Sequence, residues 1–160
     1  MYFPTHESPE TEYVLGFAFD QKYSRVLLIN KNKPGWQAGL KNGVGGKIET
    51  YDPTVAHAMV REFEEETSIE TETYQWKLFA QHAAPTKPGS FHLHVLSIEL
   101  TADQSIHLAH PTTELPEWVS VSRLSELLST GVSGVVMYIA MALNHRNKPL
   151  STMTLETPLI

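Results

Sequence analysis

The chain has 160 residues, of which 41% are hydrophobic and 19% are charged, and a formal net charge of −6. It contains no cysteine, which excludes disulfides, thiolate metal ligands and cysteine nucleophiles. The acidic balance argues against a nucleic-acid polymer as partner. No apolar run approaches the roughly 20 residues of a membrane-spanning helix, so we expect no membrane partner.

The first half of the chain predicts strands separated by turns. Residues 1–10 look like a loose lead-in without the basic start and apolar stretch of a signal peptide, so we expect a cytoplasmic protein. Runs of β-branched and aromatic residues predict strands over 13–19 and 25–29, joined as a hairpin. Residues 30–42, with a proline, two glycines and many polar side chains, should form a long loop. A short strand is expected over 44–49.

The second half of the chain predicts one long helix followed by further strands and helices. The long helix should begin near Asp52 or Thr54, either of which could cap it, and should end at about Ser68. This order of elements predicts a mixed α/β fold, with a single domain over 1–160, a core at about 12–145 and a flexible C-terminal tail. Further strands are expected over 74–83, 91–100 and 118–121, and further helices over 123–128 and 133–145.

The most informative stretch is 61–66, which reads Arg-Glu-Phe-Glu-Glu-Glu. On a helix that advances ~100° per residue, Glu62, Glu65 and Glu66 share one face, separate from the apolar stripe. Such acidic runs are usually solvated surface. These acids, however, lie towards the helix C-terminus, where the macrodipole disfavours negative charge, and Glu62 and Glu66 are like charges four residues apart. Bound Mg²⁺ or Mn²⁺ would neutralise them.

The segment from Gly45 to Ile69 resembles the Nudix box, the signature of the Nudix hydrolases, which include MutT-like nucleotide pyrophosphohydrolases. Two positions depart from that signature. Ser68 stands where the family has glycine, and the loop before the helix is one residue too long, which displaces Asp52 by one place from the family's loop glutamate. The matching residues are Gly46 for the opening glycine, Arg61 and Glu62 for the Arg-Glu pair, Phe63 for the apolar position, Glu65 and Glu66 for the Glu-Glu pair, and Ile69 for the final aliphatic residue.

The resemblance implies a fold and a metal site. The fold would be a Nudix-type α/β/α sandwich, with a mixed sheet between helices. The cofactor would be Mg²⁺, for which Mn²⁺ could substitute, and Arg61 would orient one of the box carboxylates. The metal ligands would be the side chains of Glu62, Glu65 and Glu66 and the backbone carbonyl of Gly45.

The resemblance leaves the general base open, because relatives use either a glutamate of the box or an acid from a later loop. Glu66 or Glu62 could serve within the box. Glu114 is the best candidate outside it, since it precedes the strand expected at 118–121.

Two further residues are candidates for substrate binding. Lys47 directly follows the paired glycines and could bind a phosphate or a box glutamate, or it could be an ordinary surface lysine. Trp36 lies in the long loop, where it could stack on a nucleobase or pack against the sheet.

The function expected from the resemblance is metal-dependent hydrolysis of a diphosphate linkage in a nucleoside diphosphate linked to another group. Water would attack phosphorus, and the substrate would be a small nucleotide, with a standard or oxidised nucleoside triphosphate as the leading choice. The protein would be a monomer or a homodimer. The alternative is a non-catalytic nucleotide-sensing module, which the serine at position 68 and the long loop favour.

Overall fold

The computed structural model describes residues 10–85, 90–106, 114–148 and 153–156. The lead-in expected over 1–10 lies outside these residues except for Glu10, which begins the first strand. No helix in the described part of the chain is long and apolar enough to cross a membrane.

The strands are β1 (Glu10–Phe19), β2 (Arg25–Asn30), β3 (Lys41–Asn42), β4 (Val44–Lys47), β5 (Lys77–Pro85), β6 (Ser90–Glu99), β7 (Pro116–Ser120) and β8 (Met153–Glu156). The α-helices are α1 (Val55–Thr67), α2 (Ala102–Ile106), α3 (Leu127–Thr130) and α4 (Val135–His145), and 3-10 turns occupy Gly35–Gln37, Thr73–Gln75 and Val121–Glu126.

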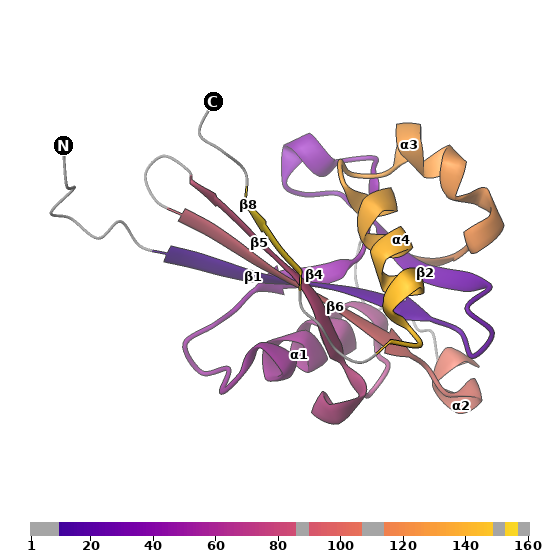
Figure 1. Cartoon of the computed structure of the whole chain (residues 1–160), viewed down its shortest axis with the longest axis horizontal. Coiled ribbons are helices and arrows are strands. Elements are labelled where there is room, and N and C mark those ends of the chain that lie inside the picture. Colours follow the sequence, from indigo (N-terminus) through magenta and orange to yellow (C-terminus); the bar gives the residue numbers. More distant parts are fainter. Residues whose placement is uncertain (1–9, 86–89, 107–113, 149–152, 157–160) are drawn as a thin grey trace, which may run out of the picture.

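All the described strands belong to one mixed sheet (Figure 1). The main order is β3-β2-β1-β6-β5-β8, with β4 paired to β1 and β7 paired to β2. The central strand is β1, which runs parallel to β6 along its whole length. On its other side, β1 pairs antiparallel first with β4 and then, at Ala18 and Phe19, with β2. The change of partner along β1 brings the glycines of β4 to the middle of the sheet.

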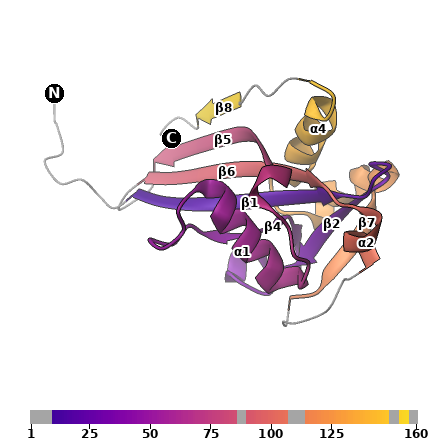
Figure 2. The same ribbon diagram turned by 90° about the horizontal axis from the view of Figure 1, so that it is seen from below.

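Helices cover both faces of this sheet, as Figure 2 shows for α1 on one side and α4 on the other. The α1 side is closed by a buried cluster that includes Met59, Phe63 and Trp76, with the Phe63 and Trp76 rings 5.1 Å apart. The α4 side has its own cluster, which includes Phe17, Phe79 and Ile139. The structure therefore confirms the expected α/β/α sandwich with a mixed sheet.

Several predicted elements need correction. Residues 73–75 form a 3-10 turn, so β5 begins at Lys77 rather than at position 74. The long loop at 30–42 contains a 3-10 turn and ends in β3, which pairs with β2. The segment 153–156, predicted to belong to a flexible tail, forms β8 and pairs parallel with β5. This pairing joins positions more than 70 residues apart, and no local sequence pattern encodes such a contact.

Candidate active site

The helix that carries the acidic run is capped at both ends. Thr54 is the N-cap, and its side-chain oxygen accepts a hydrogen bond from the His57 amide at 3.3 Å. At the other end, Ser68 adopts a left-handed conformation with φ 59° and donates its amide to the Glu64 carbonyl at 2.8 Å. Of the two predicted caps, Thr54 is confirmed and Asp52 is not. The backbone at Ser68 has the conformation that glycine adopts most readily.

The paired glycines lie in β4, where two close approaches exclude a side chain. A Cβ atom on Gly45 would lie 2.1 Å from the Val14 carbonyl oxygen of β1. A Cβ atom on Gly46 would lie 2.4 Å from the carboxyl atoms of Glu62. Only glycine leaves room for the sheet on one side and for this carboxylate on the other. The second contact places the first acid of the run directly against β4.

Arg61 ties the helix to the loop before it. Its guanidinium donates two hydrogen bonds to Asp52, at 3.0 and 2.7 Å, one to Glu62 Oε1 at 2.7 Å and one to the Lys47 carbonyl at 3.1 Å. The bonds from Arg61 hold the pKa of Asp52 below its usual range. Glu65 lies farther away, with Oε2 3.6 Å from Arg61 Nη1 and a side chain that is 60% exposed. Although Asp52 is displaced by one place in the sequence, it therefore reaches the arginine of the box.

A second ionic group surrounds Glu66 and brings distant parts of the chain together. Lys31, at the end of β2, lies with its Nζ 2.7 Å from Glu114 Oε2 and 3.8 Å from Glu66 Oε1. The other oxygen of Glu114 accepts the backbone amides of Asn32 and Lys33, at 2.9 and 3.2 Å. The side chains of Lys31, Glu66 and Glu114 are 12%, 15% and 8% exposed. The structure thus brings Glu114 to the box glutamates, with both of its oxygens already engaged.

The two glutamates differ in their protonation. Burial raises the pKa of Glu66 to about 7, with Lys31 acting against this rise and Glu114 adding to it. The Glu66 Oε2 atom is buried and has no hydrogen-bond partner among the described residues. Burial also acts to raise the pKa of Glu114, but the hydrogen bonds from Lys31 and the two amides outweigh it and keep that pKa low. Glu66 is therefore the acid with an available oxygen, and Glu114 is a fixed anion.

These side chains fit a divalent cation, although they do not form a closed cage. In the described part of the chain, no three acidic or histidine side chains converge closely enough to enclose a metal ion. Glu66 nevertheless offers a buried oxygen without a partner, and hard cations prefer such carboxylate oxygens. Acids also outnumber cations in these ionic contacts, which join Asp52, Glu62, Glu65, Glu66 and Glu114 to Lys31 and Arg61.

The two predicted substrate residues lie on the surface. Trp36 is 69% exposed, so it does not pack against the sheet. Lys47 is exposed at the end of β4, and its side chain makes no hydrogen bond or ion pair with the described residues. No contact within the described ranges joins either side chain to the box carboxylates.

Lys31 is the residue of this site that sequence reasoning missed. It stands in the run Asn30-Lys31-Asn32-Lys33, where no pattern separates it from its neighbours. Its two partners lie 35 and 83 positions away along the chain. The only available signal is its position directly after a strand, which does not say what the side chain meets.

Comparisons with known proteins agree with the fold. A family model described as NUDIX domain matches residues 10–136, while the comparison with curated proteins found no match. Three solved structures resemble the chain at 16–21% identity, a level at which the likeness shows the fold.

The first is a bifunctional NMN adenylyltransferase/ADP ribose pyrophosphatase from Francisella tularensis, complexed with AMP and a manganese ion (TM-score 0.67, 21% identity, 86% of this chain and 42% of that chain covered). The second is the NUDIX domain of Shewanella oneidensis NrtR, complexed with ADP ribose (TM-score 0.66, 16% identity, 91% and 94% covered). The third is the MutT protein from Methanosarcina mazei (TM-score 0.63, 19% identity, 90% and 100% covered).

Proposed function

The chain belongs to the Nudix family, and from this membership we propose that it is a Mg²⁺-dependent hydrolase of a nucleoside diphosphate linked to another group. The leading substrate is a standard or oxidised nucleoside triphosphate, cleaved by attack of water on phosphorus. The observation that carries the proposal is Glu66, a buried carboxylate with one oxygen that lacks a hydrogen-bond partner among the described residues.

The metal ligands that we propose are Glu62, Glu65, Glu66 and the backbone carbonyl of Gly45. When bound, Mg²⁺ would polarise the phosphate oxygens and lower the pKa of a water molecule, and Mn²⁺ could replace it. Arg61 supports this role because it fixes the carboxylate of Glu62 against β4. The side chain of Glu65 is 60% exposed and would turn towards the site from its place on the same helix face.

We assign the general base to Glu66 rather than to Glu114. A base needs a free oxygen and a pKa near the working pH. In the metal-free protein Glu66 meets both conditions, with a pKa of about 7 and an Oε2 atom that has no partner in the described part of the chain. With the metal bound, one of its oxygens would face the ion and the other would accept the proton. Both oxygens of Glu114 are occupied, and Glu62 is bonded to Arg61. In this assignment, Lys31 holds Glu114 in place beside Glu66.

On the substrate side, we propose that Trp36 stacks on the base and that Lys47 binds a phosphate. The exposure of both side chains supports this, because each is available to a ligand. Aromatic side chains stack on bases of any type, so Trp36 does not by itself select the nucleotide.

The test is turnover across a panel of standard and oxidised nucleoside triphosphates, ADP-ribose, NADH, diadenosine polyphosphates and nucleotide sugars. Each compound is incubated with Mg²⁺, with Mn²⁺ and with EDTA, and its cleavage products are separated by chromatography. A nucleoside triphosphate would give a nucleoside monophosphate and pyrophosphate, whereas a compound such as ADP-ribose would give two phosphomonoesters. Metal-dependent cleavage of a nucleoside triphosphate supports the proposal. Cleavage of another member of the panel instead overturns the choice of substrate and keeps the hydrolase.

The sensing module predicts a different outcome, namely nucleotide binding by calorimetry without turnover of any compound. Two structural observations oppose it. Ser68 ends the helix in the conformation expected for the family's glycine, and Asp52 reaches Arg61 despite the longer loop. With both departures from the signature present, the helix still ends at Ser68 and Asp52 still pairs with Arg61.

A further inference from the structure

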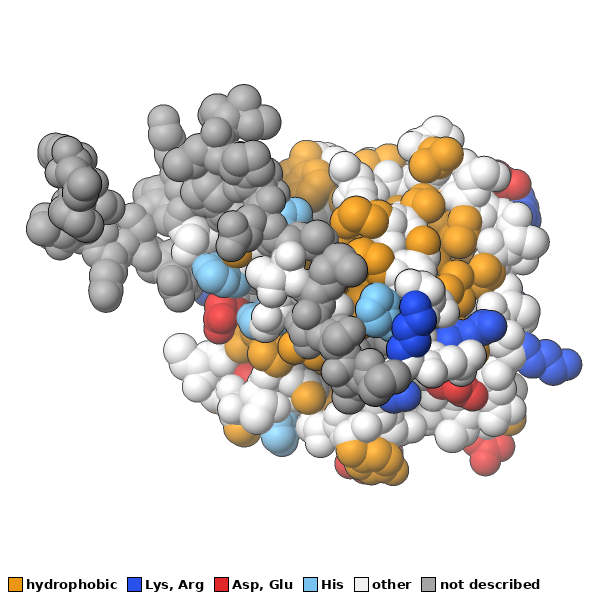
Figure 3. Space-filling view, in the orientation of Figure 1, with side chains coloured by type: hydrophobic (Ala, Val, Ile, Leu, Met, Phe, Trp, Pro, Cys, Tyr) orange, Lys and Arg blue, Asp and Glu red, His pale blue; other side chains and the backbone are white. Residues whose placement is uncertain are grey.

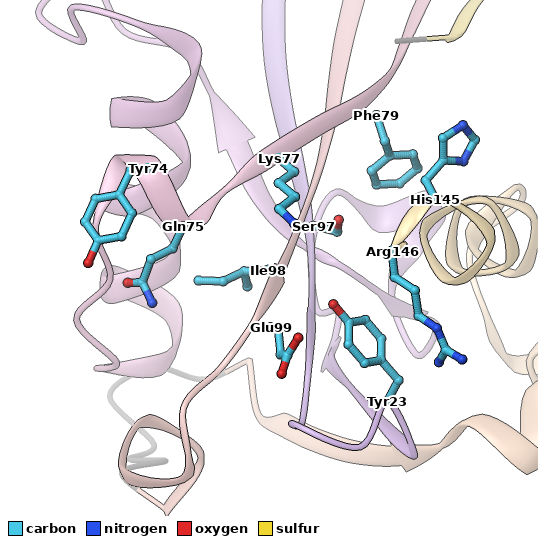
Figure 4. Close-up of a pocket in the computed structure, with 10 residues that line it drawn as sticks. All are labelled: Tyr23, Tyr74, Gln75, Lys77, Phe79, Ser97, Ile98, Glu99, His145 and Arg146. Carbon is cyan, nitrogen blue, oxygen red and sulfur yellow. The ribbon is translucent and has the colours of Figure 1, made fainter. Parts of the chain in front are cut away.

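Apart from the site at the box, the described residues form a second site, which is a cavity of about 250 Å³ (Figure 4). This second cavity lies away from the box carboxylates. Its walls come from the start of β5, the end of β6, the last turn of α4 and the turn between β1 and β2. None of the box glutamates lines it. Figure 3 shows basic and histidine side chains gathered on this side of the molecule, below the apolar surface formed by the helices. The cavity is therefore a site that the hydrolase proposal does not use.

The polar part of the cavity is positively charged. Lys77 makes no ion pair or hydrogen bond with the described residues, and in Figure 4 its amine points towards Ser97. Arg146 lies with its guanidinium carbon 5.2 Å from the centre of the Tyr23 ring and forms no ion pair within the described ranges. The one acid in the lining, Glu99, is after burial the next cause that raises the pKa of the Tyr23 phenol to about 12. Two cations and one acid therefore line this part of the cavity.

The wall built by Tyr23 is held in a conformation that costs energy. Tyr23 has φ 53°, a left-handed backbone that costs a residue with a side chain roughly 1–2 kcal/mol. The ring stacks on Phe19 at 5.1 Å. The turn is fixed by Asp20, which accepts the amides of Ser24 and Arg25 at 2.8 and 3.1 Å. Strain of this kind persists where the surrounding structure enforces it and is common at ligand sites.

The other wall is formed by the half-buried ring of His145. Behind it lies Phe79, which is 2% exposed and whose ring stacks on His145 at 6.5 Å. The Nδ1 atom of His145 donates to the Met141 carbonyl at 2.8 Å, which fixes the ring at the rim. A ligand would therefore meet the ring of His145 on one side and cationic groups on the other.

We propose that this cavity binds a small phosphomonoester, with its phosphate between Lys77 and Arg146 and its body against the ring of His145. Two cations and the hydroxyl of Ser97 suit a dianion with several acceptor oxygens better than they suit a single carboxylate. The cavity is smaller than the roughly 300–1,000 Å³ of pockets for drug-sized ligands, so the ester must be compact. A sugar phosphate such as ribose 5-phosphate has the required size and charge.

The test is a titration of the full-length ¹⁵N-labelled chain with ribose 5-phosphate, inorganic phosphate and benzoate in EDTA, followed by NMR. EDTA keeps metal–phosphate complexes out of the box. Ribose 5-phosphate should shift the amides of Ser97 and His145 and leave those of Gly45 and Gly46 unchanged. It should bind more tightly than inorganic phosphate, and benzoate should bind most weakly.

Variants locate the charge that binds the ligand. Lys77→Gln with Arg146→Gln should weaken binding at least about tenfold, while the exposed Lys148→Gln, at the same helix end but outside the cavity, should change it less than about twofold. Thermal unfolding of each variant shows that the fold is retained. The proposal would be overturned by shifts confined to Gly45 and Gly46 or by no binding up to about 10 mM. It would also be overturned if benzoate bound more tightly than ribose 5-phosphate, or if the double variant bound as tightly as the wild type.

Discussion

At the scale of single residues, the site depends on a few side chains in unusual surroundings. Ser68 occupies a backbone conformation that favours glycine. Glu66 is a buried acid with one oxygen that has no partner in the described part of the chain. Both features affect stability as well as activity, because strain and burial cost free energy in the folded state.

Replacing Ser68 with glycine should stabilise the protein by about 0.5–1 kcal/mol, because glycine adopts positive φ without the steric cost. The measurement is urea denaturation, with turnover expected to stay unchanged since the side chain is exposed. Ser68→Ala is the matched control and should not stabilise, because alanine keeps the Cβ atom. Equal midpoints for the wild type and Ser68→Gly would show that the helix end carries no such strain.

The buried carboxylate of Glu66 should make stability depend on pH in metal-free protein. Its pKa is raised in the folded state to about 7. The stability that protonated Glu66 contributes is therefore fully present below the unfolded pKa, near 4.5, and is lost as pH rises through 7. In EDTA, the free energy of unfolding of Glu66→Gln should therefore rise by roughly 1–3 kcal/mol relative to that of the wild type when the pH is raised from 5 to 8. Urea denaturation at both values measures this, with the exposed Glu64→Gln as control. A gain equal to that of Glu64→Gln would contradict the role of burial.

The assignment of the base predicts unequal losses of turnover at saturating Mg²⁺. Glu66→Gln should lower kcat by about 10²–10⁴-fold, the range for loss of a general base, and Glu114→Gln should lose less than about tenfold. Mn²⁺ affinity, measured on the same proteins, separates a lost metal ligand from a lost base. A larger loss in Glu114→Gln would move the base to the loop before β7.

At the scale of elements, α1 is joined to its preceding loop through Arg61. The loop that is one residue too long ends with Asp52 bonded to Arg61 by two hydrogen bonds. Asp52 also accepts the Glu49 amide at 2.9 Å, which closes the loop on itself. The loop with the additional residue therefore still brings Asp52 to Arg61.

Asp52→Ala should release this loop and weaken catalysis without removing a proposed ligand. The Asp52 and Arg61 side chains are 5% and 20% exposed, so loss of their bonds should cost about 1–3 kcal/mol of stability. Turnover or metal affinity should fall about 10–100-fold, as when the partner of a metal ligand is removed. Denaturation and Mg²⁺-dependent kinetics test this, with Glu49→Gln in the same loop as control. Unchanged kinetics in Asp52→Ala would show that Arg61 orients Glu62 alone.

At the scale of the whole molecule, the sheet separates two cores with different tasks. The core on the α1 side supports the box, while the α4 side carries the second cavity at the end of its helix. Strand β8 closes the sheet beside β5. Because β8 lies on the far side of β6 from β1 and β4, it should contribute to the sheet edge rather than to the box.

Ending the chain after Lys148 should therefore expose the edge of β5. We expect faster hydrogen exchange at the amides of 80–83, which pair with β8, and turnover within about twofold of wild type, since exchange reports local opening of a sheet edge. Mass spectrometry of exchange in both chains measures this. Unchanged exchange over 80–83 would show that β8 does not protect the edge.

The sequence by itself determined the features that depend on neighbours along the chain. The shared helix face of Glu62, Glu65 and Glu66, a helix cap at either Asp52 or Thr54 and the β1–β2 hairpin all follow from local periodicity and residue type. For the same reason, the resemblance to the Nudix box, contained in 25 consecutive residues from Gly45 to Ile69, identified the family before any contact was known.

Only the tertiary structure decided which distant residues meet. Lys31 and Glu114 are 83 positions apart, β8 reaches β5 across more than 70 residues, and the second cavity combines Tyr23, Lys77 and Arg146. Such contacts depend on strand order and on how the sheet is covered, which local propensity does not encode. In the sequence, Lys31 looks like an ordinary surface position, and Glu114 is a candidate only because it precedes a predicted strand. They become part of the site because folding buries them together, where each needs the other's charge.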